Sequence, residues 1–402
     1  MENNKRAIYI FFTILAFTAI GLTFSDQMFS NYFKDAYNIN AYQRGLVEFP
    51  RELPGILGLL IIASLSFLGD IRISIIAQIL SAVGILALGL LTPTFGGMLI
   101  FLFINSLGMH LFFPLQDGIG MSLITSNIGK RMGQYKAVGT AFSMITSIIV
   151  FIGFKNGWFS LTTPIKYVFL FSSVAFIITA LLFLKLQRIV KTPIHSDRRF
   201  KFIFRKEYKF YYILAIMNGA QKQILFVYAP WLLIDVLGKK VDTIVILSII
   251  GAFLGMFFLQ AIGKGLDKYG VKKMLYADAL SFIIVYIAYG VMATGFVSGR
   301  FATYGIPALL TLGIFVLDKL SMQFAMVRTI YLRSILVNKS EMTQTLSLGI
   351  SLDHIFTIIC AYFGGLIWVT FGPQYTFFIT ASLSIVNLVV AKLVVVNTNH
   401  DE

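Results

Sequence analysis

The chain has 402 residues, of which 57% are hydrophobic and only 13% are charged. Soluble domains have about 45–50% apolar and about 25% charged residues, so this composition excludes an ordinary soluble protein. The formal charge is +15, and most of the basic residues lie in short connections between apolar runs. This distribution argues against a nucleic-acid-binding surface.

Long apolar runs follow one another from the amino terminus, where the first begins at Ala7 and is longer than the core of a signal peptide. A helix needs about 20 apolar residues to cross a hydrocarbon core of about 30 Å. Continuously apolar runs favour helices over barrel strands, which alternate. We predict an all-α polytopic membrane protein with twelve transmembrane helices, over residues 7–31, 41–68, 72–91, 96–123, 133–154, 164–186, 208–236, 242–262, 273–296, 304–333, 344–370 and 374–396.

The connections between these spans differ in their content of lysine and arginine. If the amino terminus lies in the cytoplasm, most basic loop residues also face the cytoplasm. The outer loops then contain only Lys34, Lys155, Lys166, Lys239, Lys240 and Arg300. The positive-inside rule therefore predicts a cell-membrane protein with both termini in the cytoplasm.

The longest polar segment, residues 186–209, divides six spans from six. We predict a six-helix bundle over residues 1–187, a cytoplasmic linker over 188–207 and a second bundle over 208–402. The basic linker either faces anionic inner-leaflet lipid or serves only to set the topology.

The two halves resemble each other when the sequence is shifted by 210 residues. Residues 131–139 then align with 341–349. Identical residues in this register include Gln134 and Gln344, Gly139 and Gly349, and Trp158 and Trp368. Duplicated six-helix halves are typical of transporters with parallel repeats.

The segment GKGLDKYGVKKML, residues 263–275, resembles the loop signature of the major facilitator superfamily, through Gly263, Asp267, Lys268, Gly270, Lys272 and Lys273. The copy expected between spans two and three is shortened to LGDIR, with Gly69, Asp70 and Arg72. The resemblance covers the whole chain. It implies two pseudo-symmetric six-helix bundles around a cavity that opens alternately to each side. Gating roles are assigned on this basis to Asp70, Arg72, Asp117, Arg131, Asp267, Lys268 and Lys272.

The resemblance further implies that helices 1, 4, 7 and 10 line the cavity, and polar residues occur on all four. Charged side chains inside a membrane normally face a cavity or a partner. Lys222 and Lys319 each either contact an anionic group or are neutralised by an acid, and His110 is either a hydrogen-bonded core histidine or a proton relay. The predicted substrate-binding residues are Asp26, His110, Gln221, Lys222, Asp318 and Lys319.

The segment VEFPRELPG, residues 47–55, places three ionisable side chains in the second span. Glu48, Arg51 and Glu52 have the spacing i, i+3 and i+4 and share one helical face. If Arg51 pairs with one carboxylate, the other suits a group that binds and releases a proton, and we expect Glu52 to be that group. A static ion cluster and direct substrate contact are the alternatives. Asp353 and His354 are second candidates for proton coupling.

These features predict a secondary active transporter for a small organic solute, with anionic or zwitterionic solutes favoured because the cavity residues carry both signs of charge. We expect a proton, or else sodium, as the coupling ion. No Walker motif is present, which argues against direct use of ATP. We expect a monomer in the bilayer, with no cofactor, no metal and no nucleic-acid partner.

Three alternatives remain open. A drug or amphiphile efflux antiporter is disfavoured because span five, VGTAFSMITSIIVFIGF, lacks the proline of the antiporter motif. A receptor or sensor with the same fold would show no saturable uptake. A membrane-embedded enzyme is disfavoured because the sequence contains no nucleophile motif and its single cysteine, Cys360, cannot form a cysteine metal cluster.

Overall fold

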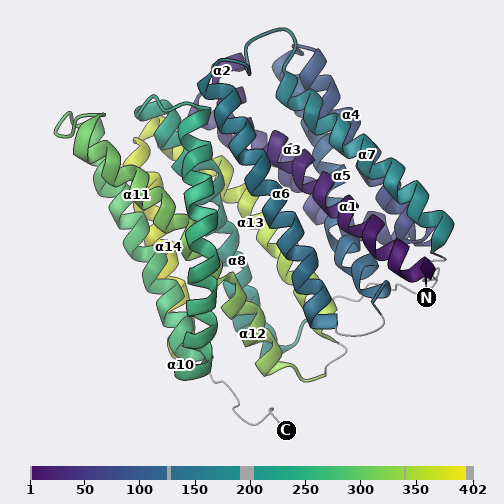
Figure 1. Ribbon diagram of the computed structural model, residues 1–402. Helices are drawn as coiled ribbons and strands as arrows, with labels where there is room; N and C mark the ends of the chain where they lie inside the picture. The colour runs from purple at the N-terminus through teal and green to yellow at the C-terminus, as the bar shows by residue number, and fades with distance from the viewer. Residues whose placement is uncertain (1, 125–127, 191–202, 339–340, 395–402) are drawn as a thin grey trace. The chain divides into compact units, whose positions relative to one another are not determined.

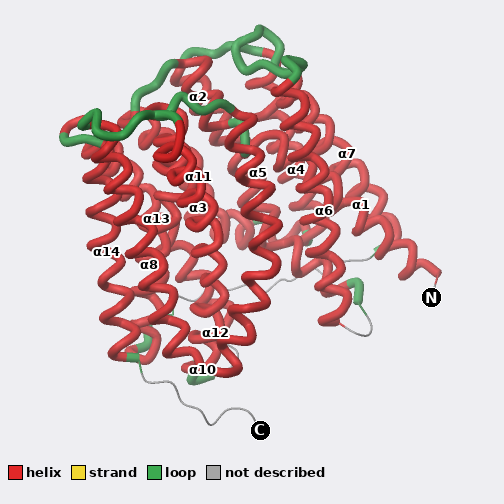
Figure 2. Tube along the Cα trace, turned by 60° about the vertical axis from the view of Figure 1, so that its left-hand side comes forward, coloured by secondary structure: helices red, strands yellow, loops and turns green. Residues whose placement is uncertain are grey.

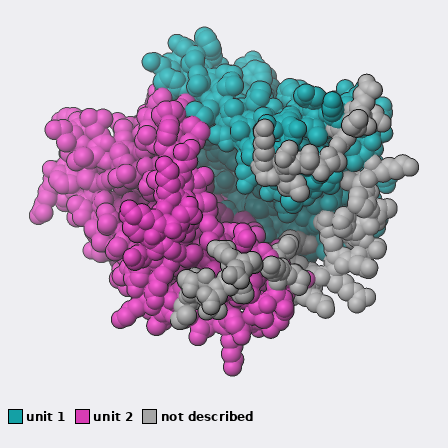
Figure 3. Space-filling view, turned by 60° about the horizontal axis from the view of Figure 1, so that its bottom comes forward, with its two compact units in different colours: residues 1–37, 50–200 teal, residues 38–49, 201–402 magenta. Residues whose placement is uncertain are grey.

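The computed structural model describes residues 2–124, 128–190, 203–338 and 341–394. These residues form helices and connecting loops, without a strand among them (Figures 1 and 2). The chain divides into two compact units, which Figure 3 distinguishes by colour. The first unit contains residues 1–37 and 50–200, and the second contains residues 38–49 and 201–402.

In the first unit, α4 packs on α5 and α7, and α1 packs on α6 and α7. Helices α4 and α5 approach each other closely at Gly108, where an added Cβ would lie 2.3 Å from the carbonyl oxygen of Ala77. Asn105 also joins α5 to α4, because its side-chain amide donates to the carbonyl of Ser81 at 2.9 Å. The helices involved are α1 (Glu2–Asp26), α2 (Phe29–Tyr37), α3 (Ala41–Ser64) from Pro50 onward, η1 (Ser66–Leu68), α4 (Asp70–Leu90), α5 (Phe95–Ser122), α6 (Ile128–Lys155) and α7 (Tyr167–Ile189).

In the second unit, α10 packs on α11 and α14, and α8 packs on α13 and α14. The long helix α10 is broken at Gly270, whose φ of 76° and ψ of 165° favour glycine. It therefore consists of two helical segments, one before and one after Gly270, which we call its first and second legs. The helices are η2 (Lys206–Tyr208), α8 (Lys209–Gln223), η3 (Ile224–Tyr228), α9 (Ala229–Trp231), η4 (Leu232–Val236), α10 (Val241–Val297), α11 (Gly305–Ser321), η5 (Met322–Phe324), α12 (Ala325–Ile335), α13 (Met342–Thr370) and α14 (Pro373–Leu393).

Nine helices in the described part of the chain are long and apolar enough to cross a membrane. One of them is α10, whose two legs provide two spans. The charged helix α3 and the segment from α8 to η4 supply the other two. This segment is interrupted by two π-turns, η3 and η4. The described helices thus account for the twelve spans predicted from the sequence.

The beginning of α3 belongs to the second unit, although the rest of the helix belongs to the first. A Cβ on Gly45 would lie 2.2 Å from the carbonyl oxygen of Ala361 on α13. A Cβ on Gly365 would lie 2.5 Å from the carbonyl oxygen of Ala41. Glycine is required at both positions because any larger residue would collide with backbone.

The segment before α8 is fastened to the residues before α13. Glu341 accepts hydrogen bonds from Arg205 at 2.8 and 2.6 Å, from the Tyr208 hydroxyl at 2.6 Å and from the Asn338 amide at 3.0 Å. The bidentate bond to Arg205 gives this contact a fixed geometry.

Candidate functional site

A row of alternating charges crosses the second unit. Arg328 donates to Asp278 at 3.2 Å and, through its other terminal nitrogen, to the Asn218 carbonyl oxygen. The Asn218 amide nitrogen donates to Asp353 at 2.8 Å, and the Lys222 ammonium lies 3.4 Å from the second oxygen of Asp353. Two cations and two carboxylates are thus joined through one amide. We call these five residues the ion network.

Helix geometry and one glycine bring the ion network together. Asn218 and Lys222 are four residues apart on α8, so their side chains project from the same face. Between them in sequence, Gly219 lets α13 approach, because a Cβ there would lie 2.3 Å from the carbonyl oxygen of Asp353. Thr357 of α13 strengthens this contact by donating to the Gly219 carbonyl of α8 at 3.4 Å.

The ion network has a dry end and a solvent-accessible end. The side chains of Asp278 and Arg328 are 0% and 6% exposed, whereas those of Asp353 and Lys222 are 13% and 19% exposed. Ionic interactions are strongest where water is excluded. The dry pair joins α12 to α10, and the accessible pair can contact a solute.

In the first unit, Arg51 lies near Asp26, with 4.0 Å between Nη2 and the carboxylate oxygen. Its guanidinium also lies 5.4 Å from the centre of the Phe29 ring, a cation–π distance. Gln27, next to Asp26, donates to the Ser147 hydroxyl at 2.9 Å. These contacts place α3, α1, α2 and α6 around one polar region of the first unit.

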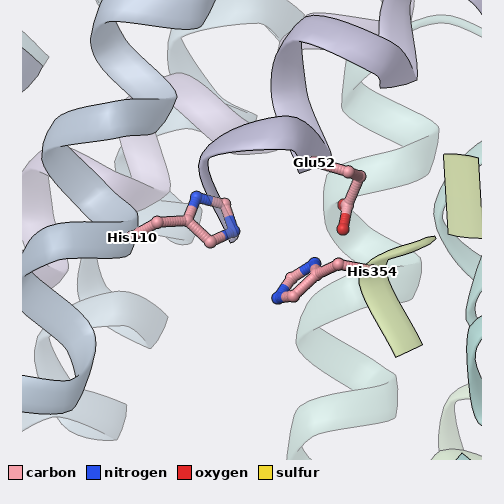
Figure 4. A group of neighbouring side chains, drawn as sticks. All are labelled: Glu52, His110 and His354. Carbon is pink, nitrogen blue, oxygen red and sulfur yellow. The ribbon is translucent and has the colours of Figure 1, made fainter. Parts of the chain in front are cut away.

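Figure 4 shows Glu52 on α3 and His110 on α5, both in the first unit, and His354 on α13 of the second unit. Glu52 and His354 are each 8% exposed. The His110 Nδ1 lies 2.9 Å from the Ser106 carbonyl oxygen and 3.1 Å from its hydroxyl. The Ser106 hydroxyl in turn donates to the backbone carbonyl of Arg51 at 2.5 Å. Ser106 thus connects His110 to the proline-containing stretch of α3.

Glu48 forms an ion pair with Arg44. The Arg44 guanidinium donates to Glu48 at 2.5 Å, and both side chains are almost fully buried. Arg44 also donates to the backbone carbonyl of Phe226 in the π-turn η3 at 3.2 Å. Arg44 can reach Glu48 because it lies four residues before it on the same helical face. The expected pairing of Arg51 with a carboxylate of this stretch stays a prediction.

The remaining predicted substrate residues lie on α8 and α11. Gln221 is buried and donates to the Ser384 hydroxyl on α14 at 3.4 Å. Asp318 is completely buried. The Lys319 ammonium lies 4.9 Å from the centre of the Phe315 ring. The methylene groups of Lys319 pack against Gly251, where an added Cβ would lie 2.7 Å from the Lys319 Cδ.

Four residues of this site are not among those predicted from the sequence: Arg44, Asn218, Asp278 and Arg328. For Arg44, the spacing of four residues to Glu48 does indicate an ion pair on one helical face. The partners of Arg328 lie 50 and 110 residues away, and no sequence pattern connects them.

The model of the Major Facilitator Superfamily matches residues 6–335. The chain belongs to this superfamily. Its members are integral membrane transporters, so the protein is a transporter. Comparison with curated protein sequences found no match.

Solved superfamily structures share the fold. A mutant form of the nucleoside transporter NupG has 14% identity and a TM-score of 0.78, covering 96% of this chain and 99% of that chain. A POT family transporter in complex with a thioalcohol-conjugated peptide has 11% identity and a TM-score of 0.76, covering 96% and 95%. A D-xylose–proton symporter has 17% identity and a TM-score of 0.67, covering 97% of each chain. At these identities the likeness shows the fold alone.

The superfamily loop signature occupies the break in α10. Asp267 and Lys268 are exposed there. Lys272 instead donates to the carbonyls of Lys392 and Val394, both at 3.0 Å, and so caps the end of α14. In the first unit, Asp70 begins α4, and its carbonyl accepts from Ser74 at 2.9 Å.

The other residues predicted to act in gating lie near helix ends of the first unit. Arg131 donates to Gln134 at 3.0 Å, and its guanidinium lies 5.9 Å from the Phe12 ring centre. Arg72 and Asp117 are exposed. Their gating roles stay predictions.

Proposed function

We propose that the protein is a secondary active transporter that moves a small anionic or zwitterionic organic solute by alternating access. The supporting observation is the accessible pair of the ion network. The Lys222 ammonium and the Asp353 carboxylate lie 3.4 Å apart and both remain partly exposed. A carboxylate or phosphate group of the solute would contact Lys222, and an ammonium group would contact Asp353.

The neighbouring groups favour a small polar solute over an amphiphilic cation. Asn218 holds one oxygen of Asp353 and ties it to the buried Arg328. Asp353 is therefore already paired with Lys222 and accepts a hydrogen bond from Asn218, which disfavours a solute with positive charge alone. A drug or amphiphile antiporter is the second candidate, and it would require that Lys222 makes no contact with the solute.

We further propose that a proton gradient drives the transport. Buried acids support this part, because an acid shielded from water responds to protonation with a large change in its interactions. Among the coupling candidates, Glu48 is held by Arg44 and Asp353 belongs to the ion network. Glu52 is the candidate from the first unit, with sodium coupling as the alternative.

Uptake by purified protein in liposomes tests the proposal. The solutes are amino acids, dicarboxylates, sugar phosphates, nucleosides, sugars and organic cations, each assayed with a pH gradient, with a sodium gradient and without either. We expect saturable, pH-driven uptake of an anionic or zwitterionic solute. The Lys222→Ala variant should lose binding of this solute, whereas the control Lys264→Ala, at an exposed position in α10, should not.

Different failures of this assay have different meanings. Uptake confined to organic cations would identify an efflux antiporter. No saturable uptake of any solute, in liposomes that retain folded protein, would favour a receptor. Unchanged solute affinity in Lys222→Ala would exclude the proposed contact.

A further inference from the structure

The middle of the seventh span has a single exposed side. Of residues 219–234, all of which the structure describes, only Lys222 and Phe226 are not buried. Phe226 is 51% exposed, although its neighbours Leu225 and Val227 are 5% and 0% exposed. A helix that faced lipid along this stretch would expose a wide apolar stripe. Two residues one turn apart mark a narrow opening in otherwise complete packing.

Lys222 indicates what this opening faces. Asn218, Lys222 and Phe226 are at positions i, i+4 and i+8, so they project from the same side of the helix. A charged side chain within a span faces a cavity or a partner rather than hydrocarbon. The Lys222 ammonium lies 3.4 Å from the Asp353 carboxylate and remains partly exposed. The Phe226 ring is therefore exposed on the side that carries the accessible pair of the ion network.

The backbone at Phe226 is held from outside its own helix. Pro230 has no N–H, so it cannot donate the i+4 hydrogen bond to the Phe226 carbonyl. Arg44 donates to this carbonyl at 3.2 Å, and Arg44 is itself paired with Glu48. The turn at Phe226 is the π-turn η3, a distortion that is common at functional sites. An exposed ring on a fixed backbone loses little freedom when a ligand packs on it, so it suits a stacking surface.

We propose that Phe226 is a stacking platform for a flat ring of the solute, beside the Lys222 ammonium that binds the solute's acidic group. The two residues are separated by about 6 Å along the helix, since each residue rises about 1.5 Å. The preferred solute is therefore an aromatic or heteroaromatic acid whose carboxylate is joined to the ring directly or by a short linker. An amino group on that linker would contact Asp353. This inference deepens the proposed function and rests on the proposed contact between Lys222 and the solute.

A flat aromatic ring gains more from this platform than a saturated ring does. Stacking of two aromatic rings adds to the burial of apolar area, because the positive edge of one ring meets the negative face of the other. A saturated ring of the same size buries a similar area but has no π-system. A comparison of an aromatic acid with its saturated counterpart therefore separates stacking from hydrophobic burial and from charge. Stacking of this kind corresponds to about a three- to tenfold difference in affinity.

Isothermal titration of the purified protein in detergent tests the platform. The probes are benzoate, phenylacetate and phenylalanine, each paired with the analogue that has a cyclohexane ring in place of the benzene ring. The wild type should bind at least one aromatic acid about three- to tenfold more tightly than its saturated counterpart. Phe226→Leu should abolish this difference, whereas Phe226→Tyr should keep it. Phe226→Met, which is also flexible and apolar, serves if Phe226→Leu does not fold. The control Phe371→Leu, at a 67% exposed position just after α13, should leave the difference unchanged.

A wild type that binds no aromatic acid more tightly than its saturated counterpart would overturn the inference, and so would an aromatic preference that persists in Phe226→Leu. Binding by Lys222→Ala and uptake into liposomes separate this inference from the proposed function. If binding of the acid is lost in Lys222→Ala but the aromatic preference does not depend on Phe226, the solute contact stands and the platform fails. If the preference depends on Phe226 while no saturable uptake occurs, the platform stands and transport fails.

Discussion

Arg44 and Glu48 form an ion pair across one turn of α3, 2.5 Å apart and almost completely buried. The same guanidinium donates to the Phe226 carbonyl in a π-turn. π-turns are common at functional sites because they disturb the regular hydrogen bonding of the helix. Arg44 therefore joins the beginning of α3 to the seventh span.

Removal of Arg44 should destabilise the protein. The Arg44→Met variant leaves the Glu48 carboxylate buried without its partner, which typically costs about 3–5 kcal/mol of free energy of unfolding. Thermal unfolding in detergent should show a clearly lower midpoint. The double variant Arg44→Met with Glu48→Leu should recover most of the loss, because no unpaired charge remains. Equal midpoints for wild type and Arg44→Met would contradict a stabilising role for the pair.

Replacement of Glu52 tests coupling in the first unit. The Glu52→Gln variant mimics a permanently protonated acid, so it should bind and exchange solute but not accumulate it under a pH gradient. The matched control is Glu48→Gln, whose defect should appear in the unfolding midpoint, since it removes the carboxylate that Arg44 binds. Normal accumulation by both variants would show that this stretch of α3 is structural.

Glu341 should make the stability depend on pH in the acid range. Hydrogen bonds from Arg205, and then from Tyr208 and Asn338, lower the pKa of Glu341 from 4.5 to about 2. A lowered pKa in the folded state means that the stabilisation is complete above the ordinary pKa and is lost as the pH falls toward 2. Glu341→Gln should therefore have a lower unfolding midpoint than wild type at pH 7, and the difference should shrink below about pH 4.5. A difference that stays constant from pH 7 to pH 3 would argue against this assignment.

The proposed orientation places the loop before α7 outside and the break in α10 in the cytoplasm. In a protein whose Cys360 is first replaced by serine, cysteines at the exposed positions Thr163 and Lys268 test it. A membrane-impermeant maleimide should label Thr163→Cys in intact cells and Lys268→Cys only after permeabilisation. The opposite pattern would reverse the proposed topology.

Hydropathy was sufficient to predict the number of membrane spans and their helical structure, because the membrane requires long apolar runs. The partners within the site were harder to predict. Arg44 was recognisable from its spacing to Glu48, but Asn218 and Asp353 are 135 residues apart. Their contact depends on Gly219, whose missing side chain lets two helices meet. The π-turns on either side of Pro230 likewise have no counterpart in the hydrophobic pattern.

The pair of Asp278 and Arg328 also bears on how the protein is made. The two residues are 50 positions apart and lie on different spans. During synthesis, the span that contains Asp278 must therefore enter the bilayer before its partner exists. An acid in a membrane helix opposes insertion, by about 2.5–3.5 kcal/mol at the helix centre and by less near a helix end, where Asp278 lies. The apolar neighbours of Asp278 have to offset this cost until α12 arrives. A nascent chain that ends before Arg328 should thus be held in the membrane less firmly than one that extends beyond it.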